Sequence, residues 1–158
     1  MEKTLLLIKP DGVERQLVGE ILSRFEKKGF RIAAMKLMRI DPALAERHYE
    51  AHKARPFYKP LVRFMTSGPV VAFVLAGANA VAVVRKMVGA TFGPDAEPGT
   101  VRGDYGLSRS FNLIHASDTQ EAARREVSLF FAEKEILDYP LDQERWIYDA
   151  EDVGGKGS

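Results

Sequence analysis

Hydrophobic side chains recur at two spacings along the chain, and each spacing predicts a different kind of element. Short apolar runs, or apolar positions alternating with polar ones, are typical of β-strands. We therefore expect strands at 4–8, 30–39, 69–76 and 111–114. Apolar residues three and four positions apart mark one face of a helix. This pattern predicts helices at 18–28, 42–52, 61–65, 80–88 and 119–131.

Capping residues set the boundaries of these elements. Gly29 is a stop signal for the first long helix, and Asp41 precedes a proline that suits the first helical position. Either Ser117 or Asp118 is expected to cap the last helix, because each stands three residues before Gln or Glu. His115 should therefore lie where the fourth strand stops, facing the start of that helix.

The segments between these elements have turn and loop chemistry. Residues 9–12 carry Pro and Gly and are expected to form a turn that ends the first strand. Residues 90–110 show no periodicity, and a loop of that length in a compact domain is usually functional or disordered. We interpret it as functional. The region that joins the helices before the third strand is expected to expose Tyr49, Phe57 and Tyr58.

The order of elements predicts the fold class. Strand, helix, strand, helical hairpin, strand, helix, loop, strand and helix follow one another, which indicates an α/β (α+β) protein built on a βαββαβ unit with additions. With 158 residues and 46% hydrophobic content, the chain can bury one proper core. We predict one domain over 1–149 and a disordered tail over 150–158.

Composition and charge limit the partners. The chain has 23 Lys and Arg against 22 Asp and Glu, so no net field would concentrate nucleic acid or bind a membrane. Cysteine is absent, which excludes disulfides and thiolate metal sites and fits a reducing compartment. The apolar run at 5–8 is too short for a signal peptide or a membrane span. We predict a cytoplasmic protein with no membrane partner and no specific nucleic-acid partner.

Three short motifs carry alternative interpretations. Residues 154–158 resemble a Walker-type phosphate loop but lack Ser or Thr directly after the lysine. His48 and His52 could share a metal, but no third ligand follows at the spacing of the zinc proteases, so a solvated helix face is expected. Residues 28–30 resemble the start of an RNA-recognition strand, but the next two residues are not those on which bases stack.

Seven polar residues at strand ends, on helix edges or in the long loop carry the candidate chemistry. They are Lys9, Tyr49, Arg85, Thr91, Arg102, Asn112 and His115. A lone histidine is more often a hydrogen-bonded structural ring than a catalyst. Together, however, these residues supply three fixed cations and neutral donors around one nucleophile. Phosphoryl transfer needs such a set, because its catalysis is mostly positioning and charge stabilisation.

Five separated motifs match the order and spacing of one family. They are Ile8-Lys9-Pro10-Asp11-Gly12, His48-Tyr49 with Arg55-Pro56-Phe57, Ser67-Gly68-Pro69-Val70-Val71, Pro98-Gly99-Thr100-Val101-Arg102-Gly103-Asp104 and Asn112-Leu113-Ile114-His115-Ala116-Ser117-Asp118. The chain therefore resembles the nucleoside diphosphate kinases from Thr4 to about Tyr148. The resemblance implies a ferredoxin-like antiparallel sheet and a ping-pong reaction, in which ATP phosphorylates a histidine and a second nucleoside diphosphate takes the phosphoryl group. It also implies Mg²⁺ held by the nucleotide phosphates.

The resemblance implies a role for each polar residue. His115 would accept the phosphate, and Glu126 would orient its ring. Lys9 and Tyr49 would serve the transferred phosphoryl group. The other phosphates would be bound by Arg85, Thr91 and Arg102. Asn112 with Lys9 would bind the sugar hydroxyls, and Phe57 would stack on the base. Ser117 would bond to Glu126 or back to the site. Stacking reads no base edge, so one pocket could accept purines and pyrimidines alike.

The chain departs from the family pattern in places, and a rival interpretation exists. Phe111 stands where many members carry arginine, and Arg109 where an aliphatic residue commonly closes the base slot. Members are hexamers or tetramers, and the segment 146–148 is closer to the hexameric kind, so we expect a homo-oligomer, hexameric rather than tetrameric. The rival is a ferredoxin-like nucleotide-binding regulatory module without catalysis. Such a module would be expected to lose His115 or Glu126, and both are present.

Overall fold

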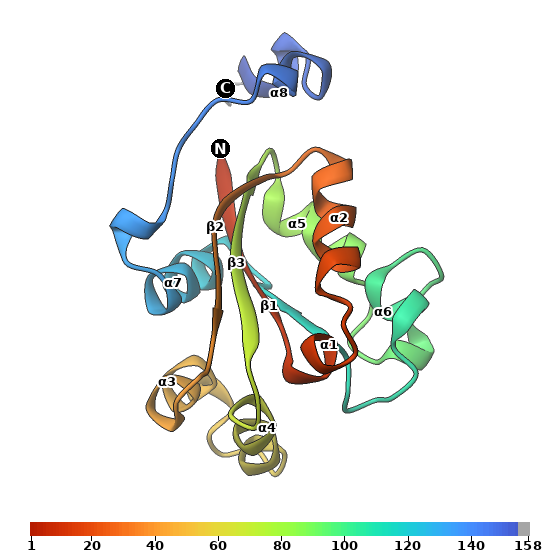
Figure 1. Ribbon diagram of the computed structural model, residues 1–158, viewed down its shortest axis with the longest axis vertical. Coiled ribbons are helices and arrows are strands. Elements are labelled where there is room, and N and C mark those ends of the chain that lie inside the picture. The colour runs from red at the N-terminus through yellow and green to blue at the C-terminus, as the bar shows by residue number, and fades with distance from the viewer. Residues whose placement is uncertain (155–158) are drawn as a thin grey trace.

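The computed structural model describes residues 1–154. It has a four-stranded sheet, which lies at the centre of the molecule (Figure 1). The strands are β1 (Glu2–Ile8), β2 (Arg31–Met38), β3 (Val70–Gly77) and β4 (Ile114–Ala116). They lie in the order β2-β3-β1-β4, and each neighbouring pair is antiparallel. The two strands that are central in space are thus the first and third in sequence.

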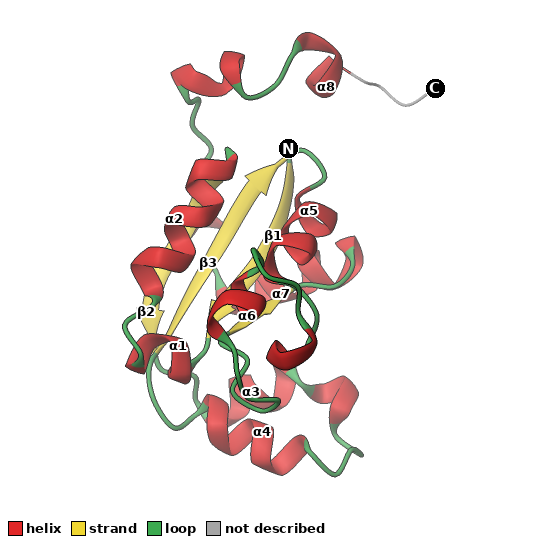
Figure 2. Ribbon diagram, turned by 90° about the vertical axis from the view of Figure 1, so that its right-hand side faces the viewer, coloured by secondary structure: helices red, strands yellow, loops and turns green. Residues whose placement is uncertain are grey.

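Helices connect the strands and cover both faces of the sheet (Figures 1 and 2). They are α1 (Pro10–Glu14), α2 (Val18–Lys28), α3 (Pro42–His48), α4 (Tyr58–Met65), α5 (Ala80–Val88), α6 (Val101–Tyr105), α7 (Gln120–Phe130) and α8 (Ala150–Gly154). Short 3-10 helices add η1 (Glu50–His52), η2 (Gly93–Asp95), η3 (Glu133–Glu135) and η4 (Asp142–Trp146). Figure 1 shows α2 and α5 on one face of the sheet and α7 on the other.

The two central strands are apolar at consecutive positions because helices cover both faces of the sheet. In β1, Leu5 and Leu7 belong to the core on the α3 and α7 side, whereas Leu6 and Ile8 belong to the core on the α2 and α5 side. All four side chains are fully buried. Successive side chains of a strand point to opposite faces, so a sheet covered on both sides needs an uninterrupted apolar run.

The topology is the ferredoxin-like βαββαβ fold that was predicted. β1, α2 and β2 form one half, and β3, α5 and β4 form the other. The hairpin of α3 and α4 is inserted between the halves, and the long loop that contains α6 lies between α5 and β4. The first insertion thus separates the two half units, and the second interrupts the second half.

Helix α2 ends where Gly29 predicted. This glycine has a φ of 114° in the left-handed region, which side chains with a Cβ adopt only at a cost. A Cβ there would also stand 2.7 Å from the side chain of Ile147. Gly29 therefore stops the helix and leaves room for the C-terminal segment to pack against it.

Two segments predicted to be irregular are helical. Pro10–Glu14 forms α1, with the proline at the start of the helix, where its fixed φ is an advantage. Within the predicted loop 90–110, Val101–Tyr105 forms α6, and Oγ1 of Thr100 caps it by accepting from the Gly103 amide over 2.9 Å. Each helix has five residues, too few for an apolar period to show.

The cap of α7 also differs from the prediction. Thr119, and neither Ser117 nor Asp118, occupies the N-cap, and its Oγ1 accepts from the Ala122 amide over 3.0 Å. Asn79 stands at the N-cap of α5, but its side chain makes no capping bond. The helices themselves are where the apolar spacing placed them, because burial of one face decides their existence more than the cap does.

The C-terminal segment folds back onto the sheet. Arg31 donates to the carbonyl of Tyr139 over 2.6 Å and to Oδ1 of Asp138 over 2.9 Å. The predicted disordered tail begins at 150, whereas the structure has α8 at Ala150–Gly154; residues 155–158, with most of the discarded phosphate-loop motif, lie outside the described residues. Across residues 1–154, every helix is too short or too polar to cross a membrane.

Candidate active site

His115 lies in the middle of β4, opposite Leu7 of β1, and not at the end of the strand as predicted. The strand starts late because a tight turn precedes it. The Ile114 amide donates back to the Asn112 carbonyl over 2.8 Å, and Leu113 between them has a φ of 72°. Ile114 and Ala116 are buried on one face, so His115 points to the opposite face, towards α3 and α7.

Glu126 holds the His115 ring through Nε2. The carboxylate projects from the inner face of α7, is 3% exposed, and accepts a hydrogen bond from Nε2 through Oε1. Oγ of Ser117 lies 3.4 Å from the same carboxylate oxygen and 3.3 Å from the Leu5 carbonyl. A carboxylate can only accept, so Nε2 carries the proton in the neutral ring and Nδ1 keeps a free lone pair.

Lys9, Asn112 and Thr91 form one hydrogen-bonded chain at the turn that precedes His115. Nζ of Lys9 donates to Oδ1 of Asn112 over 2.7 Å, and Nδ2 of Asn112 donates to the Thr91 carbonyl over 2.9 Å. Lys9 is buried, and burial together with the charge of Arg102 lowers its pKa to about 8, while Asp11 acts in the opposite direction. The structure thus brings together three residues that the sequence places far apart.

Arg102 is the most deeply bound of the predicted cations. Its guanidinium donates to three carbonyls, those of Asn112 at 3.1 Å, Ile114 at 2.5 Å and Gly89 at 3.2 Å. Burial and the charge of Arg85 lower its pKa to about 10. Arg85, in contrast, makes one bond, to the Ala116 carbonyl over 3.2 Å, and is less buried. Arg102 therefore fixes the backbone around His115, and Arg85 keeps more of its donors free.

Two residues of the α3 region are buried where the sequence predicted exposure. Tyr49 is 7% exposed, and its hydroxyl has no hydrogen-bond partner in the described residues. Burial first, and then the charge of Glu126, raise its pKa. His48 was expected on a solvated helix face but is 5% exposed. Its ring packs edge-on against His115 with centroids 4.7 Å apart, and also contacts Phe130.

His48 lies against His115, although the sequence predicted only a solvated helix face for it. Burial, with the nearby His115 as the next cause, lowers its pKa to about 2, so the ring is neutral at physiological pH. A signal was available: His48 and Tyr49 follow Ala45 by three and four residues, the spacing of one helix face. Ala45 is fully buried, and both aromatic rings share its face.

Phe57 and Arg109 stand apart from this hydrogen-bonded group. Phe57 precedes α4, is half exposed, and its ring lies 5.4 Å from that of His52. Arg109 lies over the ring of Phe92 at 3.9 Å, with Asp95 at 3.8 Å from its guanidinium. An exposed ring such as Phe57 offers a flat face to a nucleobase, whereas Arg109 already has a partner.

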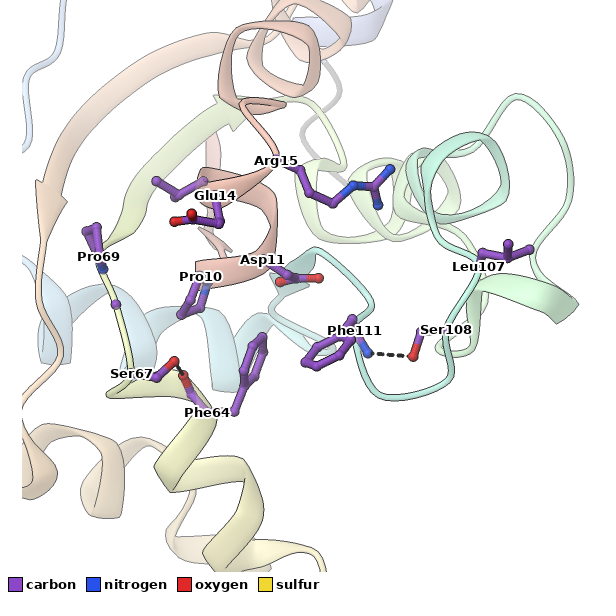
Figure 3. A pocket seen from close by; sticks show the side chains of 12 residues that line it. Pro10, Asp11, Glu14, Arg15, Phe64, Ser67, Pro69, Leu107, Ser108 and Phe111 are labelled. Atoms are coloured by element: carbon purple, nitrogen blue, oxygen red, sulfur yellow. Dashed lines mark hydrogen bonds between the residues drawn. The ribbon is translucent and has the colours of Figure 1, made fainter.

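A groove of about 460 Å³ lies beside α1 (Figure 3). Pro10, Phe64 and Phe111 are among its lining residues, and the Phe64 and Phe111 rings are 5.3 Å apart. None of the predicted site residues lines it. Phe111 therefore packs against Phe64 of α4 in this groove.

The fold and this site define a class of protein: a ferredoxin-like phosphotransferase whose histidine is held by a carboxylate, with the buried cations Lys9 and Arg102 bonded to the segment that carries it. Comparison with known proteins identifies the family within that class. The sequence model described as "Nucleoside diphosphate kinase" matches residues 2–136. The chain belongs to the nucleoside diphosphate kinase family.

Individual relatives agree with the family match. A nucleoside diphosphate kinase of Thermus thermophilus is 62% identical over 137 residues, covering 87% of this chain and 100% of the relative. One from Pelotomaculum thermopropionicum is 53% identical over 149 residues, covering 94% and 100%. A solved nucleoside diphosphate kinase from Halobacterium salinarum, in complex with CDP, has a TM-score of 0.92 and 48% identity, covering 94% and 99%.

Proposed function

We propose that the chain transfers the terminal phosphoryl group of ATP to other nucleoside diphosphates through a phosphohistidine on His115. The observation that carries this proposal is the bond between His115 Nε2 and Glu126. With Nε2 engaged, the Nδ1 lone pair attacks the γ-phosphorus while the bond to the β–γ bridging oxygen breaks and ADP leaves. A second diphosphate then takes the phosphoryl group from nitrogen by the reverse displacement, which regenerates the neutral ring.

The charged residues of the site have the chemistry to stabilise this transfer. Lys9 and Arg85 each retain donors beyond the single bond they make, and cations aimed at phosphate oxygens stabilise charge best where water is excluded. We assign the transferred phosphoryl group to Lys9 and Tyr49. Tyr49 supports this role because its buried hydroxyl has no partner within residues 1–154 and can donate to a phosphate oxygen.

The distal phosphates and the nucleoside would be held by the remaining predicted residues. Arg85, Arg102 and Thr91 would bind phosphates, and Asn112 with Lys9 would bind the sugar hydroxyls. The exposed face of Phe57 would stack on the base, which admits purines and pyrimidines alike. The relative from Halobacterium salinarum was solved with CDP, a pyrimidine nucleoside diphosphate, which is consistent with such a site.

Mg²⁺ would enter with the nucleotide. Within residues 1–154, the one group of three metal-ligating side chains near the site contains two histidines and one glutamate. Mg²⁺ prefers oxygen ligands and an octahedral shell, so this donor set does not suit it, whereas the phosphates of ATP do. Bound to the phosphates of ATP, Mg²⁺ would neutralise part of their charge, and Lys9, Arg85 and Arg102 would neutralise the rest.

A homo-oligomer, with a hexamer favoured over a tetramer, is part of this proposal. β2 is an edge strand of the sheet, and Met35 and Leu37 on it are 53% and 67% exposed. The C-terminal segment bonds to β2 near its start, where the Leu137 amide donates to the Ala33 carbonyl over 2.8 Å, and it leaves these two apolar side chains exposed. An edge strand with exposed apolar residues invites pairing with another strand. Light scattering during size-exclusion chromatography would give the subunit number. The cytoplasmic location stays a prediction from the sequence.

The test of the function uses γ-labelled ATP and the His115→Ala variant. The wild-type protein should acquire one acid-labile, base-stable label per chain and pass it to any added nucleoside diphosphate. His115→Ala should acquire none, yet still bind ADP in a calorimetric titration, because binding rests on other residues. A wild-type protein that binds ADP but takes no label would be the regulatory module instead.

A further inference from the structure

His48 is a buried histidine that the proposed reaction does not use. Its side chain is 5% exposed, and neither ring nitrogen has a hydrogen-bond partner in the described residues. Leaving a buried polar group unpaired is costly, and native structures rarely do so without a reason. A Phe or Leu side chain could fill this position against Phe130 without that cost. A histidine here is therefore better explained if its ring nitrogens bind a ligand.

The nitrogens of His48 lie in a cluster with two further ligand atoms. One nitrogen of His48, one of His115 and a carboxylate oxygen of Glu126 all lie within 4.8 Å of one another. In a tetrahedral zinc site, ligand bonds are about 2.0–2.2 Å long, which sets neighbouring ligand atoms roughly 3.4 Å apart. Small rotations of buried side chains would bring the three atoms to that separation, with the His115–Glu126 bond opening to admit the ion.

We propose that His48, His115 and Glu126 form an inhibitory site for a borderline transition-metal cation such as Zn²⁺. Two imidazoles and one carboxylate are a common ligand set for zinc, with the fourth position open to water. Mg²⁺ would not compete, because it binds nitrogen ligands poorly. Formation of the site depends only on these three residues; inhibition rests on the proposed role of His115.

Inhibition follows from the tautomer that the metal requires. Without the metal, Nε2 donates its proton to Glu126, so the lone pair of Nδ1 is free to attack. A metal on Nε2 occupies the lone pair there, and the neutral ring then carries its proton on Nδ1. The metal also separates Glu126 from the ring, which loses its orientation. The bound cation therefore removes the nucleophile without touching the nucleotide-binding residues.

The chain offers a matched control, because it contains three histidines and the third is exposed. His52 lies in η1, four residues after His48, and is no member of the cluster. The comparison is between His48→Phe, which keeps an aromatic ring but no ligand, and His52→Phe. Circular dichroism would confirm that both variants fold.

The experiment is a titration of Zn²⁺ into chelator-treated, nucleotide-free protein in competition with a chromogenic chelator. Wild type and His52→Phe should bind one Zn²⁺ per chain, and His48→Phe should bind it at least tenfold more weakly. Equal affinity in wild type and His48→Phe would overturn the site, as would loss of binding in His52→Phe. Phosphohistidine formation by the zinc-loaded wild type, measured with Mg²⁺ and ATP, should fall at least tenfold. It should recover once a chelator removes the zinc and excess Mg²⁺ is restored; an unchanged rate would overturn the inhibition alone.

Imidazole NMR spectra of the wild-type protein test the site without any substitution. Zn²⁺ should shift the ring nitrogen signals of His48 and His115 and leave those of His52 in place. Shifts confined to His52 would contradict the proposal even if His48→Phe failed to fold. Because this measurement uses no nucleotide, its outcome is also separate from whether the protein is a kinase.

Discussion

Nζ of Lys9 donates a hydrogen bond to Oδ1 of Asn112 over 2.7 Å, which joins the end of β1 to the turn that precedes His115. Asp11 makes a second link, because its carboxylate accepts from the Leu113 amide over 3.1 Å. The Lys9 amide makes a third by donating to the Leu113 carbonyl over 2.8 Å. These three hydrogen bonds from the segment 9–11 fix the turn, and the turn positions His115, which follows it.

The lowered pKa of Lys9 predicts that nucleotide affinity falls in mildly alkaline solution. In the free protein this pKa is about 8, so the cation is present below that pH and lost as the pH rises through it. A bound phosphate favours the charged form and raises the pKa, so binding above pH 8 takes up a proton. Calorimetric titration of ADP from pH 7 to 9.5 should show affinity falling about tenfold per unit above pH 8.

Two variants show whether Lys9 is the residue responsible for the loss of affinity at high pH. Lys9→Gln should bind ADP more weakly at pH 7 and show no further loss up to pH 9.5. Lys27→Gln, at the exposed end of α2, should behave as wild type. An alkaline loss of affinity that survives in Lys9→Gln would show that another group titrates.

Arg85 and Arg102 should differ in what they contribute to stability. Arg102 donates to three carbonyls and is 4% exposed, so Arg102→Lys would leave at least one buried carbonyl unpaired. The expected loss is about 3 kcal/mol in the free energy of unfolding. Arg85 bonds one carbonyl, so Arg85→Lys should cost less than about 1 kcal/mol.

Both substitutions should still slow turnover, because an ammonium cannot grip two phosphate oxygens as a planar guanidinium does. Urea unfolding and steady-state kinetics on the two variants separate the effects. Equal stability of Arg102→Lys and wild type would mean that its carbonyl bonds contribute little to the fold.

The long elements were predictable because burial imposes a period on the sequence. The apolar run of β1 and the helical face of α2 are examples, the order of such elements predicted the fold class, and Gly29 predicted the end of α2. The five-residue helices α1 and α6 could not be recognised, since a single turn needs no apolar face. The start of β4 was placed too early because the apolar residues before it form the turn at Leu113, whose positive φ no hydrophobic pattern reports.

The identity of the site residues was easier to predict than their arrangement. His115, Lys9 and Asn112 came from motifs, and the structure joins two of these motifs through the bond between Lys9 and Asn112. Arg102 was expected to bind phosphate, but its three carbonyl partners come from segments that only the tertiary fold assembles. His48 was placed on a solvated helix face because no third metal ligand follows it, and Tyr49 was expected to be exposed in the helical hairpin. Their helical spacing from the buried Ala45 indicated the core instead.

Leu113 offers a test of how strongly the turn before His115 is constrained. Its φ of 72° costs about 1–2 kcal/mol for a residue with a Cβ, and its side chain is fully buried. Leu113→Ala removes the buried side chain and keeps the backbone cost, whereas Leu113→Gly removes both. The free energy of unfolding of the glycine variant should therefore exceed that of the alanine variant by about 1 kcal/mol. Glycine is usually the less stable of the two, so the order is reversed here. If urea unfolding shows the alanine variant to be the more stable, the hydrogen bonds around residue 113 do not force its φ to be positive.

Glu126→Gln tests whether the carboxylate does more than fill space beside His115. Glutamine keeps the shape and one acceptor oxygen, but it lacks the charge that stabilises the ring as positive charge develops on phosphorylation. The rate of phosphohistidine formation should fall about 10²-fold, a typical contribution for a positioned charged group of this kind. ADP affinity should change less than about twofold, because Glu126 is proposed to contact the ring and not the nucleotide.

Glu121→Gln is the matched control for Glu126→Gln, since Glu121 lies exposed in the first turn of the same helix. Rapid-quench measurement of the labelled protein, over pH 5.5 to 8.5, would show whether the defect is constant across the range. A constant defect indicates that the ring is badly held and poorly stabilised. A defect that disappears at one end of the range would mean that Glu126 acts by controlling ionisation, and the orienting role proposed here would be wrong.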